Sequence, residues 1–192
     1  MENIYALSDI IEKYIPGDWG EDCCSEGASC PVSCIRGADI VPIENNDYKG
    51  IPTRWISAKS LNARRLSEGD IIIEKSGGSP IQSTGRVVFI SQDLLEEKSD
   101  IVCSNFCSAF RIKEGWNPKY VYYYLKHVYN SGVFFNFEGK TSGLKNLQME
   151  IAFKSLNIEK KSPEEQSAIV DTLSVIERKL AVNRQINENL AG

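Results

Sequence analysis

The sequence has no apolar run that approaches the roughly 20 residues needed to cross a membrane. Its first residues, Met1 to Tyr5, also lack the basic and apolar segments of a secretory signal. We therefore expect a cytoplasmic protein with no membrane contact. The composition, 42% hydrophobic and 25% charged residues, is ordinary for a globular protein that buries a core.

Histidine is almost absent, because His127 is the only one. It stands beside an apolar helical stripe, which is typical of a structural residue, so a Ser/His/Asp or Cys/His catalytic set has no plausible base. The cysteines show no paired C-x₂-C spacing of a zinc site. They are Cys23, Cys24, Cys30, Cys34, Cys103 and Cys107. We expect reduced thiols and no metal.

Complete cofactor and nuclease motifs are also missing. The loop Ser76–Ser79 lacks the Gly-Lys-Ser/Thr ending of a phosphate-binding P-loop. Asn117–Tyr120 differs from the Asn-Pro-Pro-Tyr motif of amino-methyltransferases and is explained by a helix start with proline at its first position. Glu138-Gly-Lys140 has no aspartate placed on a nearby preceding strand to complete a nuclease metal site. The chain is therefore interpreted as a binding protein without a catalytic centre or cofactor.

The net charge of −4 gives no bulk support for nucleic-acid binding, but the charges are unevenly distributed. Residues 1–47 are rich in acids and contain only Lys13 and Arg36 as bases. Residues 48–67 contain no acid and carry Lys49, Arg54, Lys59, Arg64 and Arg65. A second acid-free stretch, 139–149, carries Lys140 and Lys145. Such stretches form either a phosphate-binding face or an ordinary solvated surface, and charge alone favours neither.

Short strand and helix signals alternate irregularly and predict an α+β domain with a mixed or antiparallel sheet and a few helices. Helices are expected at Leu7–Tyr14 and from Pro118 to about Asn130, the latter capped by Asn117. A polar loop is expected at Gly139–Gly143. Strands are expected at Val32–Ile35, Ile40–Ile43, Ile71–Ile73, Arg86–Ile90, Phe106–Ile112 and Val133–Phe137.

The last thirty or so residues predict one long helix of a coiled-coil type. Ser162 is a good N-cap, Pro163 suits the first helical position, and Glu165 is placed to close a capping box. Behind this start, apolar residues recur at alternating four- and three-residue spacing, and asparagines continue the seam. The predicted subunit interface is Ile169, Leu173, Ile176, Leu180, Asn183 and Leu190. A seam of this length predicts a partner helix in another chain or another copy of this one.

Several short segments, each weak alone, follow one another in a specific order. They are Gly17–Gly20, Ile35–Asp39, Gly69–Pro80, Gly85–Arg86, Ser104–Phe106, Phe110–Arg111, Pro118–Leu125, Gly139–Leu147 and Ser162–Leu173. In this order they resemble the target-recognition domain and conserved-region helix of specificity subunits of type I restriction–modification systems. The chain departs from that pattern in having one recognition domain and one helix instead of two of each. The cysteine-rich insert from Cys23 to Cys30 is also outside it.

The resemblance implies that residues 1–159 form a DNA target-recognition domain and residues 160–192 a helix for subunit docking. It further implies that the chain reads one half of a bipartite site in double-stranded DNA. The implied partners are the methyltransferase subunit, the restriction subunit and a second copy bound through antiparallel helices. The partners supply S-adenosylmethionine and ATP chemistry, so this chain is expected to be non-catalytic. The alternatives are a fragment of a single-chain restriction or methylation enzyme, and a protein–protein adaptor that acts through its helix.

Basic and polar side chains in the acid-free stretches and loops are the candidate DNA contacts, since arginine and glutamine suit base edges while lysine, serine and threonine suit phosphates. They are Lys49, Arg54, Lys59, Arg64, Arg65, Lys75, Ser76, Ser79, Gln82, Thr84, Arg86, Lys140, Thr141, Ser142 and Lys145.

Overall fold

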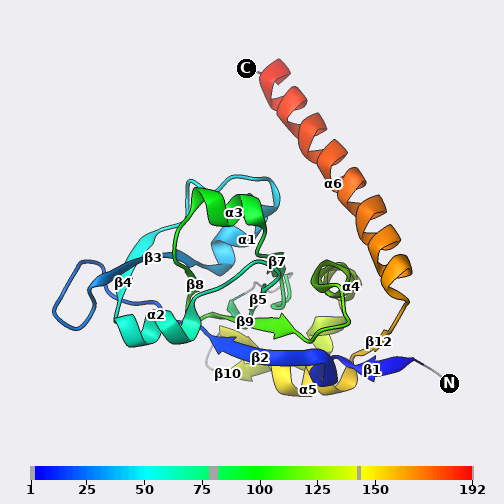
Figure 1. The fold of residues 1–192 in the computed structure, drawn as a ribbon, viewed down its shortest axis with the longest axis horizontal. Coiled ribbons are helices and arrows are strands. Elements are labelled where there is room, and N and C mark those ends of the chain that lie inside the picture. Colours follow the sequence, from blue (N-terminus) through cyan, green and yellow to red (C-terminus); the bar gives the residue numbers. More distant parts are fainter. Residues whose placement is uncertain (1–2, 78–81, 142–143, 192) are drawn as a thin grey trace.

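The computed structural model describes residues 3–77, 82–141 and 144–191 and shows an α+β body from which one long helix projects (Figure 1). Strands and helices are interleaved along the chain, so the α+β class expected from the sequence is confirmed. No helix within these ranges is long and apolar enough to span a lipid bilayer.

A four-stranded antiparallel sheet in the order β2-β9-β5-β7 forms the centre of the body. Its strands are β2 (Ile11–Pro16), β5 (Ile71–Glu74), β7 (Val87–Phe89) and β9 (Cys107–Ile112). Strand alternation directs Ile71 and Ile73 into one hydrophobic core and Ile72 into another. The run of three isoleucines predicts a strand correctly, and it lacks alternation because both faces of the sheet are covered.

The first core lies between this sheet and a group of helices. These are η1 (Leu7–Ile10), α4 (Pro118–Asn130), η3 (Val133–Phe137) and α5 (Met149–Ser155). Helix α4 begins as predicted, because the Asn117 Oδ1 atom accepts a 2.9 Å hydrogen bond from the backbone N–H of Lys119. Phe110 and Phe153 pack edge to face, with ring centroids 5.3 Å apart, between sheet and helices.

The second core lies on the opposite face of the sheet, under η2 (Gly37–Asp39), α1 (Ile40–Glu44) and α3 (Gln92–Glu97). Beside it, β3 (Cys30–Ile35) pairs antiparallel with β4 (Thr53–Ile56) and parallel with β8 (Ile101–Cys103). Helix α2 (Ala58–Arg64) covers this second sheet.

Two small sheets complete the body. One joins β6 (Ser76–Gly77) to the hairpin formed by β10 (Glu138–Thr141) and β11 (Leu144–Leu147). The other pairs β1 (Ile4–Ala6) with β12 (Asn157–Glu159) and so ties the start of the chain to the segment before the last helix.

The helix predicted at Leu7–Tyr14 is wrong, because the chain forms a 3₁₀ turn at Leu7–Ile10 and then enters β2. A β-bulge between Ile11 and Lys13 shifts the register of β2 against β9. Ile11 therefore faces the first core and Ile15 the second, although a regular strand would place both on one face. The bulge removes the period-two pattern, and the remaining spacing imitates a helix.

The strand predicted at Ile40–Ile43 is also wrong, since these residues open helix α1. The Asp39 Oδ2 atom accepts a 2.8 Å hydrogen bond from the backbone N–H of Arg36, which closes the turn before the helix. Ile40 and Ile43 face the second core at helical spacing, while Val41 is 47% exposed.

Two further expectations need correction around the hairpin. Val133–Phe137 is a 3₁₀ helix entered through Gly132, whose φ of 72° ends α4, and not a strand. The loop expected at Gly139–Gly143 begins in strand β10, where Lys140 faces Lys145 across the hairpin. Backbone pairing with a neighbouring strand, which the polar sequence does not signal, makes this segment extended.

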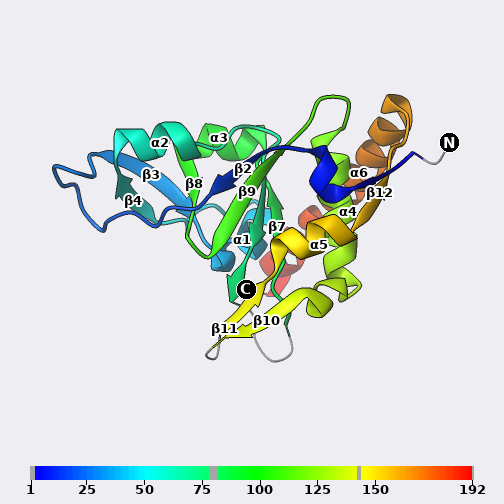
Figure 2. The same ribbon diagram turned by 90° about the horizontal axis from the view of Figure 1, so that it is seen from below.

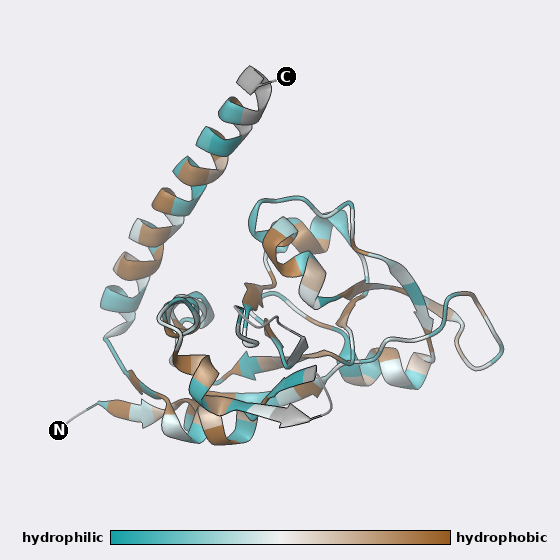
Figure 3. Cartoon of the chain, turned by 180° about the vertical axis from the view of Figure 1, so that it is seen from behind, coloured by the Kyte–Doolittle hydropathy of each residue, from teal (hydrophilic) through white to brown (hydrophobic). Residues whose placement is uncertain are grey.

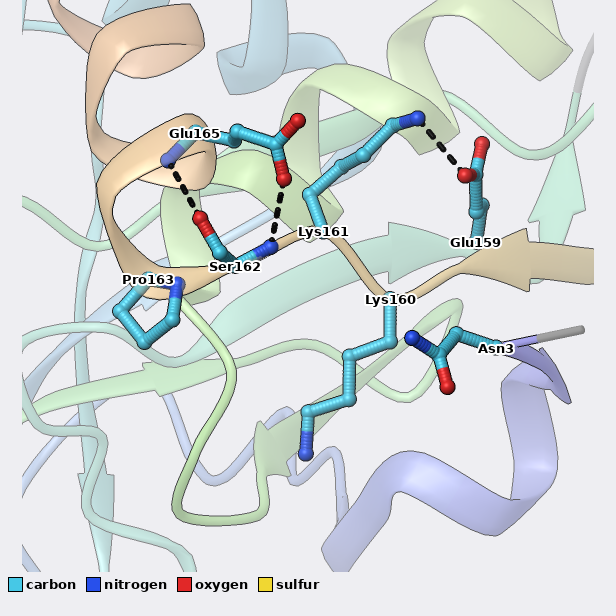
Figure 4. Close-up of a pocket in the computed structure, with 7 residues that line it drawn as sticks. All are labelled: Asn3, Glu159, Lys160, Lys161, Ser162, Pro163 and Glu165. Carbon is cyan, nitrogen blue, oxygen red and sulfur yellow. Dashed lines mark hydrogen bonds and ion pairs between the residues drawn. The ribbon is translucent and has the colours of Figure 1, made fainter. Parts of the chain in front are cut away.

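The final helix, α6, runs from Pro163 to Ala191. Figure 4 shows its predicted capping box: the backbone N–H of Ser162 donates to Glu165 Oε2 at 2.9 Å, and that of Glu165 donates to Ser162 Oγ at 3.2 Å. The buried Gln166 side chain accepts a 2.7 Å hydrogen bond from the backbone N–H of Asn117 at the start of α4. Val170 is buried in the first core. The division at residue 160 stays a prediction, and the first turns of α6 contribute to the core of the body.

A polar cluster on α4 holds the middle of α6. Glu177 accepts from Lys126 at 2.9 Å and from the Tyr123 hydroxyl at 2.7 Å. Lys126 also pairs with Glu44 of α1 at 3.1 Å. Burial alone lowers the pKa of Lys126, but the two carboxylates outweigh burial and raise it, so the lysine stays charged. The cluster joins α1, α4 and α6. Farther along α6, Arg184 donates a hydrogen bond to the Asn45 side chain in the turn after α1.

Candidate nucleic-acid interface

The largest group of predicted contacts lies where β6 meets the β10–β11 hairpin. Pairing of β6 with β11 places Ser76 opposite Asn146 and Gly77 opposite Lys145. The Ser76 hydroxyl also hydrogen-bonds the Asn146 side chain. Lys75 precedes β6, is partly exposed, and forms no ion pair with any described residue. Two segments far apart in sequence thus form one polar edge with an available lysine.

Glu138 organises the side chains around this edge. Its carboxylate accepts from the backbone N–H of Thr84 at 2.8 Å and from the Thr84 hydroxyl at 3.2 Å. It also pairs with Lys145 at 3.1 Å, and Lys145 reaches the carbonyl oxygen of Gln82 at 3.3 Å. Thr84 is fully buried, so it holds the loop in place and does not present a hydroxyl to a ligand. Reasoning from sequence missed Glu138 as a positioning residue because its partners are distant along the chain.

Arg86 is directed inward and not toward solvent. Its guanidinium makes two hydrogen bonds, at 2.8 and 2.7 Å, to the carboxylate of Glu74, a residue only 3% exposed. The hydrogen bond that Arg86 donates to Glu74 raises the pKa of Arg86 above its ordinary value. This largely buried pair supports the structure beside the polar edge, because removing either partner leaves an unpaired charge.

Arg54 also lies outside any exposed surface, at 7% exposure. It donates to the carbonyl oxygens of Trp19 and Gly20 at 3.0 and 3.1 Å, and it pairs with Asp22. Its guanidinium lies 4.2 Å from the centroid of the Trp19 ring. Arg54 is therefore engaged within the body and is not presented to a ligand.

The other bases of residues 48–67 are outside this edge: Lys59, Arg64 and Arg65 belong to α2 or follow it, and Lys49 lies beside α1 and α6. Lys49, Lys59 and Arg65 are exposed, while Arg64 is partly exposed and donates to the Ser60 hydroxyl at 3.0 Å. Arg65 pairs with Asp100 at 2.8 Å. In Figure 2, α2 lies along the upper edge of the molecule and the β10–β11 hairpin along the lower edge. The structure therefore does not bring the two basic stretches together.

Some candidates cannot be assigned a side-chain environment. Ser79 and Ser142 lie outside the described residues, and only the backbone of Lys140 and Thr141 is described. Gln82 is partly exposed, and its amide lies 3.5 Å from the Tyr129 hydroxyl.

The cysteines do not assemble into a metal centre within the described ranges. Cys34, Cys103 and Cys107 are buried free thiols, whereas Cys23 and Cys24 are exposed. Burial raises the pKa of Cys34 to about 12 and that of Cys107 to about 11. The buried cysteines therefore behave as small apolar residues.

The fold is similar to part of the fold of three chains in solved structures. A chain from a structure titled for complex assembly and conformational transition of the type I R-M system aligns at a TM-score of 0.61 and 15% identity, covering 97% of this chain and 41% of that one. The type I restriction–modification S subunit from M. genitalium aligns at 0.58 and 15% identity, with 99% and 43% covered. The HsdS subunit from Thermoanaerobacter tengcongensis aligns at 0.52 and 15% identity, with 95% and 39% covered.

Residues 39–191 match the family described as type I restriction modification DNA specificity domain, and the chain belongs to that family. The family expected from the sequence motifs is thereby confirmed. The chain spans about two fifths of the length of the solved relatives above. No curated protein matches the sequence.

Proposed function

We propose that the chain is the DNA-reading part of a specificity subunit, that it recognises one half of a bipartite site, and that it positions methyltransferase and restriction subunits. The observation that carries the proposal is the polar edge at β6 and the β10–β11 hairpin, within a chain of the DNA specificity family. Its loops are held by Glu138 and by the Glu74–Arg86 pair, so polar groups are presented from a rigid frame. The chain itself supplies recognition, and its partners supply the chemistry.

In this proposal Lys75 contacts a DNA phosphate, since it has no carboxylate partner among the described residues and stands beside the polar edge. Gln82 is the described candidate for reading a base edge, because it is partly exposed and its amide both donates and accepts. Lys145 is a weaker candidate, since it is already paired with Glu138 and its side chain is only 19% exposed.

The second part of the proposal concerns α6 and a partner helix. Several large apolar side chains of α6 are 47–50% exposed: Val175, Ile176, Leu180, Val182 and Ile186. Figure 3 shows hydrophobic residues in brown along the projecting part of the helix. Asn183 is exposed in the same seam, and the side chain of Leu190 lies outside the described part. Leu173 instead packs against the first core, so the proposed seam consists chiefly of Ile176 and Leu180. We propose that an antiparallel helix, from a second copy of this chain, covers it.

The DNA proposal is tested by selecting duplexes from a random pool with the purified chain and then measuring affinity against salt concentration. Lys75→Ala should weaken binding to all sequences and lower the salt slope by about one, because one phosphate contact is lost. Lys98→Ala is the matched control, since Lys98 is also partly exposed but lies at the end of α3. Failure of the chain to enrich any sequence contradicts the proposal. If Lys75→Ala and Lys98→Ala change DNA affinity equally, the polar edge is not the DNA-binding surface.

Neutralising Arg64 and Arg65 together separates the two basic regions. If the hairpin edge binds DNA, this double variant should behave like Lys98→Ala. A loss of affinity and of salt slope confined to the Arg64/Arg65 variant would place the interface at α2 instead.

A further inference from the structure

A hollow of about 400 Å³ opens beside the polar edge. It is enclosed by the loop after β2, by η2, by the end of β5 with β6, and by the turn between β8 and β9. Its volume lies within the range of about 300–1,000 Å³ typical of sites for small molecules. Because Ser76 and Gly77 both line it and belong to β6, the hollow adjoins the proposed DNA interface.

Two aromatic side chains form its walls. Phe106 is 56% exposed, the largest exposure among the large hydrophobic residues described. Its carbonyl oxygen accepts from the backbone N–H groups of Lys75 and Ser76 at 2.8 and 3.0 Å, so its turn is fixed to the edge. Trp19 also lines the hollow, and the Arg54 guanidinium packs on its ring. A rigidly held, exposed aromatic residue at the mouth of a hollow is suited to stacking on a flat ligand.

The floor of the hollow presents a buried carboxylate. Glu74 pairs with Arg86, and a carboxylate retains further acceptor positions after accepting two hydrogen bonds. Two glycines let the backbone approach this carboxylate closely, because neither carries a side chain. A Cβ atom at Gly37 would lie 2.4 Å from Glu74 Oε1, and one at Gly77 would lie 2.8 Å from it. Gly77 also has a φ of 138°, which side-chain-bearing residues rarely adopt.

We propose that this hollow receives one nucleobase that leaves the stack of the bound DNA, with an exocyclic amino group hydrogen-bonded to Glu74. Aromatic walls match the flat faces of a base, and the carboxylate matches the amino donor at its edge. A base inside the duplex exposes only its groove edges, so a base must be unstacked to enter a recessed site between aromatic rings. The inference rests on the proposed DNA recognition and names a further site within it.

The test uses the full chain and the duplex selected above. Each position in turn is placed opposite an abasic site, which removes the pairing that holds a base in the stack. One position should bind about tenfold more tightly when its base is released in this way, and Phe106→Ala should abolish that gain. Tyr14→Ala is the matched control, because Tyr14 is a 46% exposed aromatic residue outside the hollow and should keep the gain. At the responsive position, purine in place of adenine, or another base without the amino group, should bind more weakly.

The result that overturns the inference is sequence-specific binding with no responsive position, or a gain that survives in Phe106→Ala. Either outcome leaves the DNA-reading function intact, so the two proposals fail separately. A Phe106→Ala variant that binds DNA normally but loses the methyltransferase subunit also overturns it and assigns the hollow to a protein side chain. Circular dichroism checks that Phe106→Ala is folded, as expected for a substitution at an exposed side chain.

Discussion

The exposed apolar residues of α6 allow a quantitative prediction about assembly. Ile176 and Leu180 are 48% and 50% exposed, so about half of each side chain remains to be buried. Full burial of such a side chain contributes about 1.5–3 kcal/mol, which leaves roughly 1 kcal/mol for each at a helix pair. Replacing both in the two copies therefore removes about 4 kcal/mol, or about a thousandfold in the dissociation constant.

We predict that Ile176→Asp with Leu180→Asp converts a dimer into a monomer, because aspartate also places unpaired charge in the seam. Light scattering over a concentration series measures the mass, and circular dichroism checks the fold. The body should melt unchanged, since neither residue belongs to its cores. The control Ile176→Leu with Leu180→Ile keeps the seam apolar and should remain dimeric.

Two results would refute this reasoning. An aspartate variant that dimerises like the parent chain shows that α6 is not the interface. A parent chain that stays monomeric at high concentration shows that the exposed seam is covered by a different partner. Leu173 is unsuitable for this test, because it packs on the body and its loss would change folding as well as pairing.

Three further predictions concern the pH dependence of stability, the reactivity of the thiols and the absence of catalytic activity. The pKa of Cys34 and of Cys107 is raised above the ordinary value of about 8.5, so the folded chain keeps protons that the unfolded chain releases. The thiols therefore do not reduce the free energy of unfolding below about pH 8.5, and that free energy should fall as the pH rises toward about 11. The measurement is the melting temperature, which should decline over this range. An alkylating reagent at pH 8 should modify the exposed Cys23 and Cys24 and spare Cys34 until unfolding, and rapid loss of the Cys34 thiol in the folded chain would contradict its assigned environment. The chain alone should transfer no methyl group, cleave no DNA and hydrolyse no ATP; single-turnover methylation by the purified chain, measured with labelled S-adenosylmethionine, would contradict the binding role.

The sequence by itself determined the features whose causes are local. The start of α6 follows from Ser162, Pro163 and Glu165, because a capping box closes within one turn. The start of α4 follows from Asn117 and Pro118, because the asparagine side chain caps the first turn. The order of short motifs also identified the family, because the order of residues can be read from the sequence without knowledge of how the chain packs.

Only the tertiary structure decided which side chains are available at the candidate site. Arg54 and Arg86 are of a residue type that commonly contacts DNA. In the structure, however, Arg54 hydrogen-bonds the Trp19 carbonyl oxygen and Arg86 the Glu74 carboxylate within the body. Glu138, considered for a nuclease metal site, instead holds the loop that contains Thr84. These roles depend on contacts between residues that are 12 to 54 positions apart, and no local pattern encodes them.

The same distinction applies to packing. The bulge in β2 removes the apolar alternation by which a strand is recognised in a sequence. The segment is nevertheless a strand, because it pairs with β9. Along α6, Leu173 and Ile176 look equivalent as seam positions, yet the body covers the first and leaves the second exposed. Sequence periodicity determines that a helix has an apolar face, while the position of the neighbouring α4 helix decides which part of that face remains for a partner.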